Sequence, residues 1–88
     1  MPNITIYSTD WCPYCRSAKA FFDQRGLAYQ ELDLTDDDAG RVALVARTGR
    51  TSVPQIFIGE HHVGGYDDLR ALDRAGGLKP LLEKAAQG

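Results

Sequence analysis

The sequence predicts one α/β domain, over residues 1–88, in which a four-stranded mixed sheet is flanked by helices in the order β-α-β-α-β-β-α-α. Short runs of β-forming residues alternate with amphipathic segments of helical length, and several of those segments end at glycine. A helix joins the first two strands, so we expect them to run parallel with a right-handed crossover. A tight turn between the last two strands predicts a hairpin.

Each element has its own signal in the residue pattern. The first strand alternates polar and apolar residues and is rich in β-forming residues, and the third is a short apolar run typical of a buried strand. In chain order we expect a strand over residues 3–7, a helix over 13–25, a strand over 29–34, a helix from Asp36 or Asp37 to Gly49, strands over 55–58 and 61–63, a helix from Asp67 or Asp68 to Gly76, and a helix over 78–86.

Glycine, proline and aspartate mark the helix ends. Gly26 and Gly49 follow amphipathic segments, and glycine readily adopts the left-handed conformation that ends many helices. Asp36 and Asp37 are typical N-cap residues. Pro80 falls in the first turn of the last helix, where a missing N–H does no harm.

Aromatic residues and histidines complete the expected packing. We expect Phe21, Phe22 and Phe57 in the core. His61 and His62 are neighbours in a strand, so their side chains point to opposite faces and cannot chelate one ion together. We expect both histidines to lie on a solvated hairpin.

Charge and hydropathy exclude several classes of partner. The net charge is -2 with both signs mixed along the chain, which argues against nucleic acid or an anionic membrane as the main partner. No apolar run approaches the roughly 18 residues needed to span a bilayer. Met1-Pro2-Asn3 lacks the basic and apolar regions that begin a signal peptide. We expect a cytoplasmic monomer.

The chain has two cysteines, Cys12 and Cys15. A disulfide closing so small a loop would restrict the unfolded chain very little, so a purely structural role is disfavoured. A zinc or iron–sulfur site usually needs four ligands, and one chain supplies two thiols. A C-x-x-C pair beside a β-α-β pattern is typical of redox chemistry.

The position of the dithiol suits that chemistry. Pro13 favours the first helical position, which leaves Cys12 at or next to the N-cap, where unpaired N–H groups and the helix dipole favour a thiolate. Arg16 and Lys19 add positive charge to the opening turns. Cys12 would attack a substrate disulfide, and Cys15 would then resolve the mixed disulfide.

Three motifs in register extend the interpretation beyond the dithiol: Trp11-Cys12-Pro13-Tyr14-Cys15, Thr51-Ser52-Val53-Pro54 and Gly64-Gly65-Tyr66-Asp67-Asp68. Together they closely resemble a dithiol glutaredoxin over essentially the whole chain. The resemblance implies a thioredoxin-like fold, glutathione as the reductant, no tightly bound cofactor, and reduction of protein–glutathione mixed disulfides and protein disulfides.

The resemblance also implies roles in glutathione binding. Pro54 matches the family's cis-proline, Val53 would pair with the cysteinyl part of glutathione, and Arg41 would meet its glycyl carboxylate. Many members of the family carry a lysine three residues before the nucleophile, where this sequence has Thr9, and Arg41 and Arg50 would compensate for the missing charge. The implied contacts are Tyr14, Arg41, Ser52, Val53, Pro54, Gly65, Tyr66, Asp67 and Asp68, of which the two aspartates would hold the γ-glutamyl end.

Three questions stay open at this point. The target could be ribonucleotide reductase, arsenate reductase or glutathionylated proteins in general. Because residue 9 is threonine and not lysine, reduction by thioredoxin reductase is an alternative to reduction by glutathione. A [2Fe–2S] cluster shared by two chains through Cys12 and two glutathione thiols is a third alternative, disfavoured because Pro13 stiffens the motif and Cys15 competes for Cys12.

Overall fold

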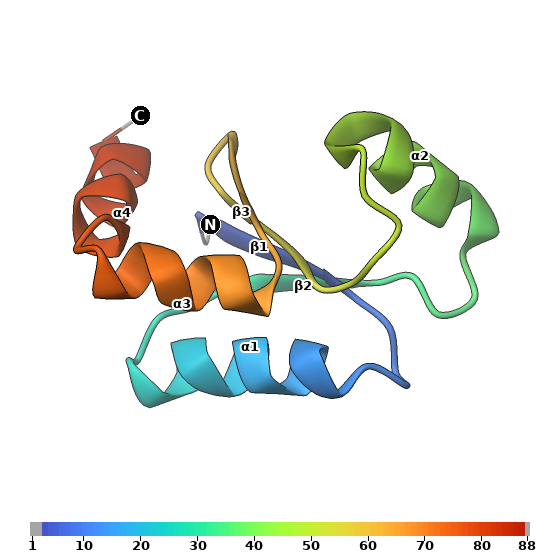
Figure 1. Ribbon diagram of the computed structural model, residues 1–88, viewed down its shortest axis with the longest axis horizontal. Coiled ribbons are helices and arrows are strands. Elements are labelled where there is room, and N and C mark those ends of the chain that lie inside the picture. Colours follow the sequence, from blue (N-terminus) through green and yellow to red (C-terminus); the bar gives the residue numbers. More distant parts are fainter. Residues whose placement is uncertain (1–2, 88) are drawn as a thin grey trace.

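A computed structural model describes residues 3–87 of the chain. It contains all eight predicted elements in the predicted order (Figure 1). They are β1 (Ile4–Ser8), α1 (Pro13–Gln24), β2 (Gln30–Asp33), α2 (Asp38–Thr48), β3 (Gln55–Ile58), β4 (His61–Gly64), α3 (Tyr66–Arg74) and α4 (Leu78–Gln87).

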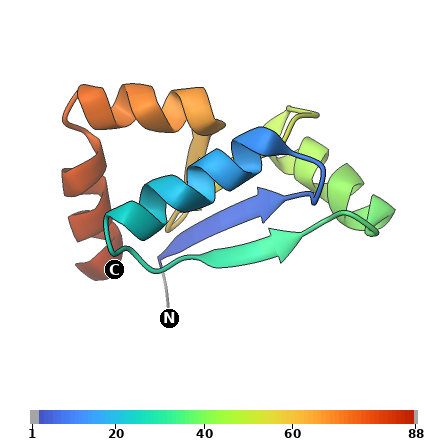
Figure 2. The same cartoon turned by 90° about the horizontal axis from the view of Figure 1, so that it is seen from below.

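The strands form one mixed sheet in the order β2-β1-β3-β4. β1 and β2 are parallel, whereas β3 is antiparallel to both β1 and β4. This topology confirms the predicted parallel pair and the predicted hairpin. Helices α1 and α3 lie together on one face of the sheet and α2 lies on the other, as the two views in Figures 1 and 2 show.

The alternation of β1 and β3 sends side chains into two separate clusters. The larger one packs Ile6 and Ile56 against Phe22 of α1 and Leu69 of α3, and all four are completely buried. Leucines of α4 close its end. Phe57 faces the opposite way. Each additional buried side chain of this size contributes about 1.5–3 kcal/mol, so the larger cluster dominates the core.

The second cluster lies under α2. Leu34, Leu44 and Phe57 are buried there, with Tyr7 and Val53 packed against them. The guanidinium of Arg47 lies 4.0 Å from the centre of the Phe57 ring. Through Val53, this cluster supports the segment that precedes β3.

Both ends of α2 follow the prediction. Asp37 is the N-cap, and its Oδ1 accepts a hydrogen bond from the Gly40 N–H at 2.8 Å. Gly49 ends the helix with a φ of 72° and donates its N–H to the Val45 carbonyl at 2.7 Å. A side chain at that φ would be strained, which is why glycine is suited to the position.

Three local predictions are wrong. Helix α3 begins at Tyr66, with Gly65 as its N-cap, because Asp68 caps the helix from its third position rather than from in front of it. His62 is half-buried and stacks on Phe57, so only His61 is on a solvated surface. Phe21 lies at the edge of the core, where the Arg25 guanidinium covers its ring.

Within residues 3–87, no helix has the length and apolar character needed to cross a membrane.

The Asp37 cap makes a measurable contribution to stability. We expect Asp37→Ala to lower the free energy of unfolding by about 1 kcal/mol, because the Gly40 N–H loses its acceptor at the start of α2. Urea denaturation measures the change. Asp36→Ala removes the same charge from the preceding exposed residue and should change stability by less than about 0.5 kcal/mol. Equal losses in the two variants would contradict the assigned cap.

Candidate functional site

Cys12 lies at the N-cap of α1, as predicted. Pro13 is the first helical residue, and the φ and ψ of Cys12 are -96° and 108°, so the chain enters the helix from an extended conformation. The Cys12 Sγ accepts a hydrogen bond from the Cys15 N–H at 3.1 Å. Its thiol donates to the Val53 carbonyl oxygen at 3.3 Å. The sulfur therefore lies between the first turn of α1 and the segment before β3.

Cys15 is the inner thiol. It is 1% exposed, and the two cysteines are free thiols. Burial, followed by the hydrogen bond with Cys12, raises the pKa of Cys15 to about 12. A thiol with that pKa is protonated near neutral pH, so it does not compete with Cys12 as the attacking group. Cys12 is also largely buried, at 6% exposed, but it lies at the N-cap and lines a surface hollow, which Cys15 does not.

Two hollows flank Val53 and together form a groove. We call the first the Cys12 hollow; it has a volume of 360 Å³ and is lined by Thr9, Trp11, Cys12, Pro13, Arg41, Leu44, Val45, Arg50, Thr51, Ser52 and Val53. The second, the Asp68 hollow, has a volume of 280 Å³ and is lined by Tyr14, Arg50, Ser52, Val53, Pro54, Gly65, Tyr66, Asp67 and Asp68.

This arrangement brings the predicted contact residues together. All but Arg41 line the Asp68 hollow, and Arg41 lines the Cys12 hollow. The Val53–Pro54 peptide bond is cis, as the resemblance implies. Val53 borders both hollows, and its N–H donates no hydrogen bond to any residue in the described range 3–87.

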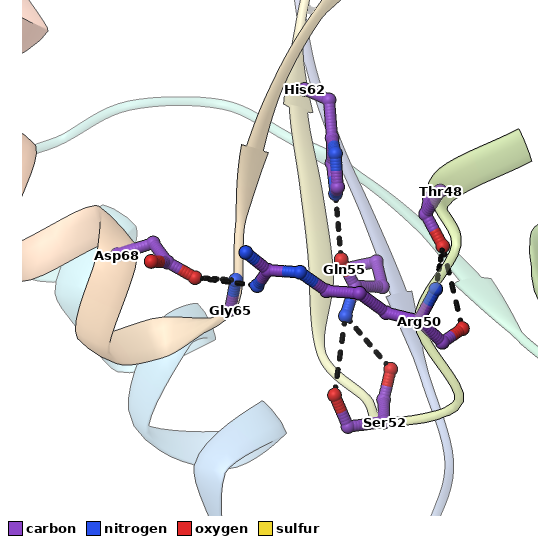
Figure 3. A network of polar contacts seen from close by, with 7 residues as sticks. All are labelled: Thr48, Arg50, Ser52, Gln55, His62, Gly65 and Asp68. Atoms are coloured by element: carbon purple, nitrogen blue, oxygen red, sulfur yellow. Dashed lines mark hydrogen bonds and ion pairs between the residues drawn. The ribbon is translucent and has the colours of Figure 1, made fainter.

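Asp68 is held in place at the start of α3. Its Oδ2 accepts hydrogen bonds from the Gly65 N–H at 2.9 Å and from Arg50 Nη1 at 2.7 Å (Figure 3). The hydrogen bond from Arg50 lowers the pKa of Asp68 most, and the hydrogen bond from Gly65 lowers it further. Asp67 is exposed beside it. One aspartate is therefore structural, and its neighbour is accessible to a ligand.

Arg41 is less available than the resemblance implies. Its guanidinium donates to the carbonyl oxygens of Leu34 and Thr35 and forms an ion pair with Asp38. Through these contacts the Arg41 side chain stabilises the segment between β2 and α2. Thr9 is only 5% exposed, and among the described residues its hydroxyl oxygen has no hydrogen-bond partner.

Sequence reasoning gave little weight to Arg50. Its side chain borders both hollows, and its backbone N–H donates to Thr48 Oγ1 at 3.1 Å. The pairing with Asp68 joins residues 18 positions apart, which no local pattern encodes. The available signal was the place of Arg50 immediately before the Thr51–Pro54 motif.

No group of three or more histidine, cysteine or acidic side chains within residues 3–87 is arranged to hold a metal ion. The reactive groups at this site are the two thiols, and the groove lies beside them.

Comparison with known proteins identifies the family of the chain. A sequence model of the family described as Glutaredoxin matches residues 4–63. The chain is 51% identical to Glutaredoxin 3 of Escherichia coli over 83 residues, which cover 94% of this chain and all of that protein. It is 50% identical to a glutaredoxin of Pseudomonas aeruginosa over 93% of this chain and 98% of that protein.

A solved structure shows the same fold. The buckwheat glutaredoxin–glutathione complex superposes with a TM-score of 0.87 and 36% identity, over 96% of this chain and 79% of that chain.

The unequal thiols predict selective alkylation. In the reduced protein at pH 8, iodoacetamide should modify Cys12 and leave Cys15 unmodified, because Cys15 is buried and the pKa of its thiol is about 12. Peptide mass spectrometry identifies the site. Both cysteines should react in the protein unfolded by urea, which is the control. Faster modification of Cys15 than of Cys12 in the folded protein would refute the assignment.

The Arg50–Asp68 pair predicts a pH dependence. Because the folded-state pKa of Asp68 is lowered, its stabilising effect is complete above the unfolded value near 4 and is lost as the pH falls through the folded value. Asp68→Asn should therefore destabilise the protein more at pH 7 than at pH 2. The side chain is 44% exposed, so we expect a difference below about 1 kcal/mol. Urea titrations at both pH values measure it; a larger loss at pH 2 would contradict the pairing.

Proposed function

The chain belongs to the glutaredoxin family of thiol–disulfide oxidoreductases, and we propose that glutathione is its reductant and that glutathionylated proteins are its main substrates. One observation carries this proposal. The Cys12 sulfur borders the groove at the point where the α1 N-terminus and Val53 meet. A peptide disulfide in the groove would then present its sulfur to Cys12.

The reaction proceeds by two thiol–disulfide exchanges. The Cys12 thiolate attacks the glutathione sulfur of a protein–glutathione disulfide, the S–S bond breaks, and the protein leaves as a thiolate that takes a proton from water. Cys12 is then bonded to glutathione. The thiolate of a second glutathione attacks the glutathione sulfur of this mixed disulfide, which releases glutathione disulfide and restores the Cys12 thiolate.

Protein disulfides require Cys15 as well. After Cys12 has attacked one substrate sulfur, the Cys15 sulfur attacks Cys12, and the enzyme is left with a Cys12–Cys15 disulfide. The substrate sulfur that Cys12 did not attack leaves as a thiolate in the first step. The substrate sulfur bonded to Cys12 leaves in the second step, when its bond to Cys12 breaks, and takes the proton that Cys15 loses. Because the pKa of Cys15 is about 12, this thiol stays protonated until that step.

The Cys15 N–H serves both exchanges. Cys12 is the nucleophile in the first exchange and the leaving group in the second. Its sulfur is therefore negatively charged when the first exchange begins and when the second exchange ends. A fixed backbone donor at 3.1 Å stabilises that charge without having to reorganise. The partial positive charge at the α1 N-terminus acts in the same direction.

The groove offers partners for each part of glutathione. The N–H of Val53 suits the cysteinyl main chain, and the first turn of α3 suits the γ-glutamyl carboxylate, with the exposed Asp67 for its ammonium group. The similar buckwheat structure is a glutaredoxin–glutathione complex, which supports glutathione as the ligand. For the glycyl carboxylate we favour Arg50, whose guanidinium pairs with Asp68 alone among the described residues, over Arg41, whose guanidinium has three partners.

The occupied Arg41 also favours one rival, reduction by thioredoxin reductase. Because Arg41 pairs with Asp38 and residue 9 is threonine, the groove attracts the glycyl carboxylate of glutathione more weakly. Supplying glutathione with glutathione reductase, or thioredoxin reductase alone, separates the two possibilities.

Single cysteine variants test the mechanism. In a glutathione-coupled assay with a small glutathione mixed disulfide, Cys12→Ser should have no activity, whereas Cys15→Ser should keep activity because that reaction never uses the inner thiol. With a protein disulfide as substrate, both variants should be inactive. Turnover by Cys12→Ser would overturn the proposed mechanism. Absence of glutathione-dependent turnover by the wild-type protein would overturn glutathione as the reductant.

A further inference from the structure

Gln55 is a fully buried amide in an otherwise apolar strand. It is the first residue of β3 and directly follows Pro54. Burying an amide is costly unless its polar atoms are paired. Both are: Nε2 donates to the Ser52 carbonyl oxygen at 2.9 Å, and Oε1 lies 2.7 Å from His62 Nε2 (Figure 3).

The partners determine which way the amide points. The Ser52 carbonyl oxygen can only accept, so the NH₂ group of Gln55 must face it and Oε1 must face His62, whose Nε2 then carries the hydrogen. Burial is the main cause that lowers the pKa of His62, and the positive charge of Arg50 adds to it. The ring stacks on Phe57 with centroids 4.9 Å apart, which keeps Nε2 directed at Gln55.

The Ser52 carbonyl belongs to the same peptide group as the Val53 N–H. In a planar trans peptide these two bonds point in opposite directions, and within the described chain only the Val53–Pro54 bond is cis. A carbonyl drawn toward Gln55 in the interior therefore turns the Val53 N–H outward. That N–H has no partner among residues 3–87, and Val53 borders both hollows of the groove.

We propose that Gln55, oriented by His62, is a positioning residue that fixes the Ser52–Val53 peptide group so that the Val53 N–H binds the cysteinyl carbonyl of a glutathione mixed disulfide. This inference rests on the proposed function. Gln55 lines neither hollow, so it acts through the peptide group and does not touch substrate. His62 acts one step further away, from β4.

Two substitutions of Gln55 test this role by separating KM from kcat. Gln55→Met keeps the shape but has no donor, and Gln55→Glu presents a carboxylate to the Ser52 carbonyl. With the mixed disulfide of glutathione and 2-mercaptoethanol at pH 8, each should raise KM about tenfold, the usual cost of one well-formed hydrogen bond, with kcat within about twofold of wild type. Gln24→Glu, in the exposed end of α1, is the matched charge control and should leave both constants unchanged.

The reactivity of Cys12 distinguishes positioning from general destabilisation. A distorted site would change kcat and the rate at which Cys12 is alkylated, whereas loss of the hydrogen bond between Gln55 and Ser52 alone should raise only KM. The rate of Cys12 alkylation should be the same in all variants.

The possible outcomes lead to different conclusions. If the wild-type protein turns over and both Gln55 variants keep its KM, the inference is overturned and the proposed function stands. A loss confined to kcat in the variants would lead to the same conclusion. No glutathione-dependent turnover by the wild-type protein would instead overturn the proposed function. Should neither Gln55 variant fold, His62→Phe decides, because it keeps a ring against Phe57 but cannot hold Oε1; an unchanged KM there would overturn the inference.

Discussion

The functional arrangement depends on one sulfur held between two backbone groups. Cys12 Sγ accepts from the Cys15 N–H and donates to the Val53 carbonyl, which lies 41 residues further along the chain. The sheet makes this meeting possible. Because β1 and β3 are antiparallel neighbours, the end of β1 lies beside the start of β3, with Tyr7 opposite Gln55. The loop that carries Cys12 and the segment that carries Val53 therefore emerge at the same edge.

The same geometry divides the chemistry between two thiols only three positions apart. Cys12 is outside the first turn of α1, next to the groove, whereas Cys15 is inside it and faces the core. Burial keeps the inner thiol neutral, and the helix N-terminus favours negative charge on the outer one. A substrate disulfide thus meets one nucleophile, and the second thiol acts only after the first has reacted.

Local signals in the sequence were sufficient for the fold and for the dithiol. Asp37 and Gly49 mark the ends of α2 through conformations that depend on their immediate neighbours. The motif residues around Cys12, Pro54 and Asp68 are brought to one groove because they end or begin elements at one edge of the sheet. What the sequence could not show is which long-range partner each polar side chain selects.

Arg41, Arg50 and His62 illustrate that limit. Arg41 was expected to be free for substrate, but the carbonyls ahead of α2 and Asp38 occupy it. Arg50 pairs with Asp68 across the groove, and His62 turns inward to Gln55 instead of outward to water. Each choice depends on distances between elements remote in sequence, which exist only once the sheet and helices have packed.

A crystal structure of Cys15→Ser trapped as its mixed disulfide with glutathione examines the central claim most directly. We expect the Cys12 sulfur to remain within hydrogen-bonding distance of the residue 15 N–H, and the glutathione cysteine to lie along Val53 with its γ-glutamyl end at the start of α3. A sulfur turned away from the α1 N-terminus, or a peptide lying outside both hollows, would contradict the account.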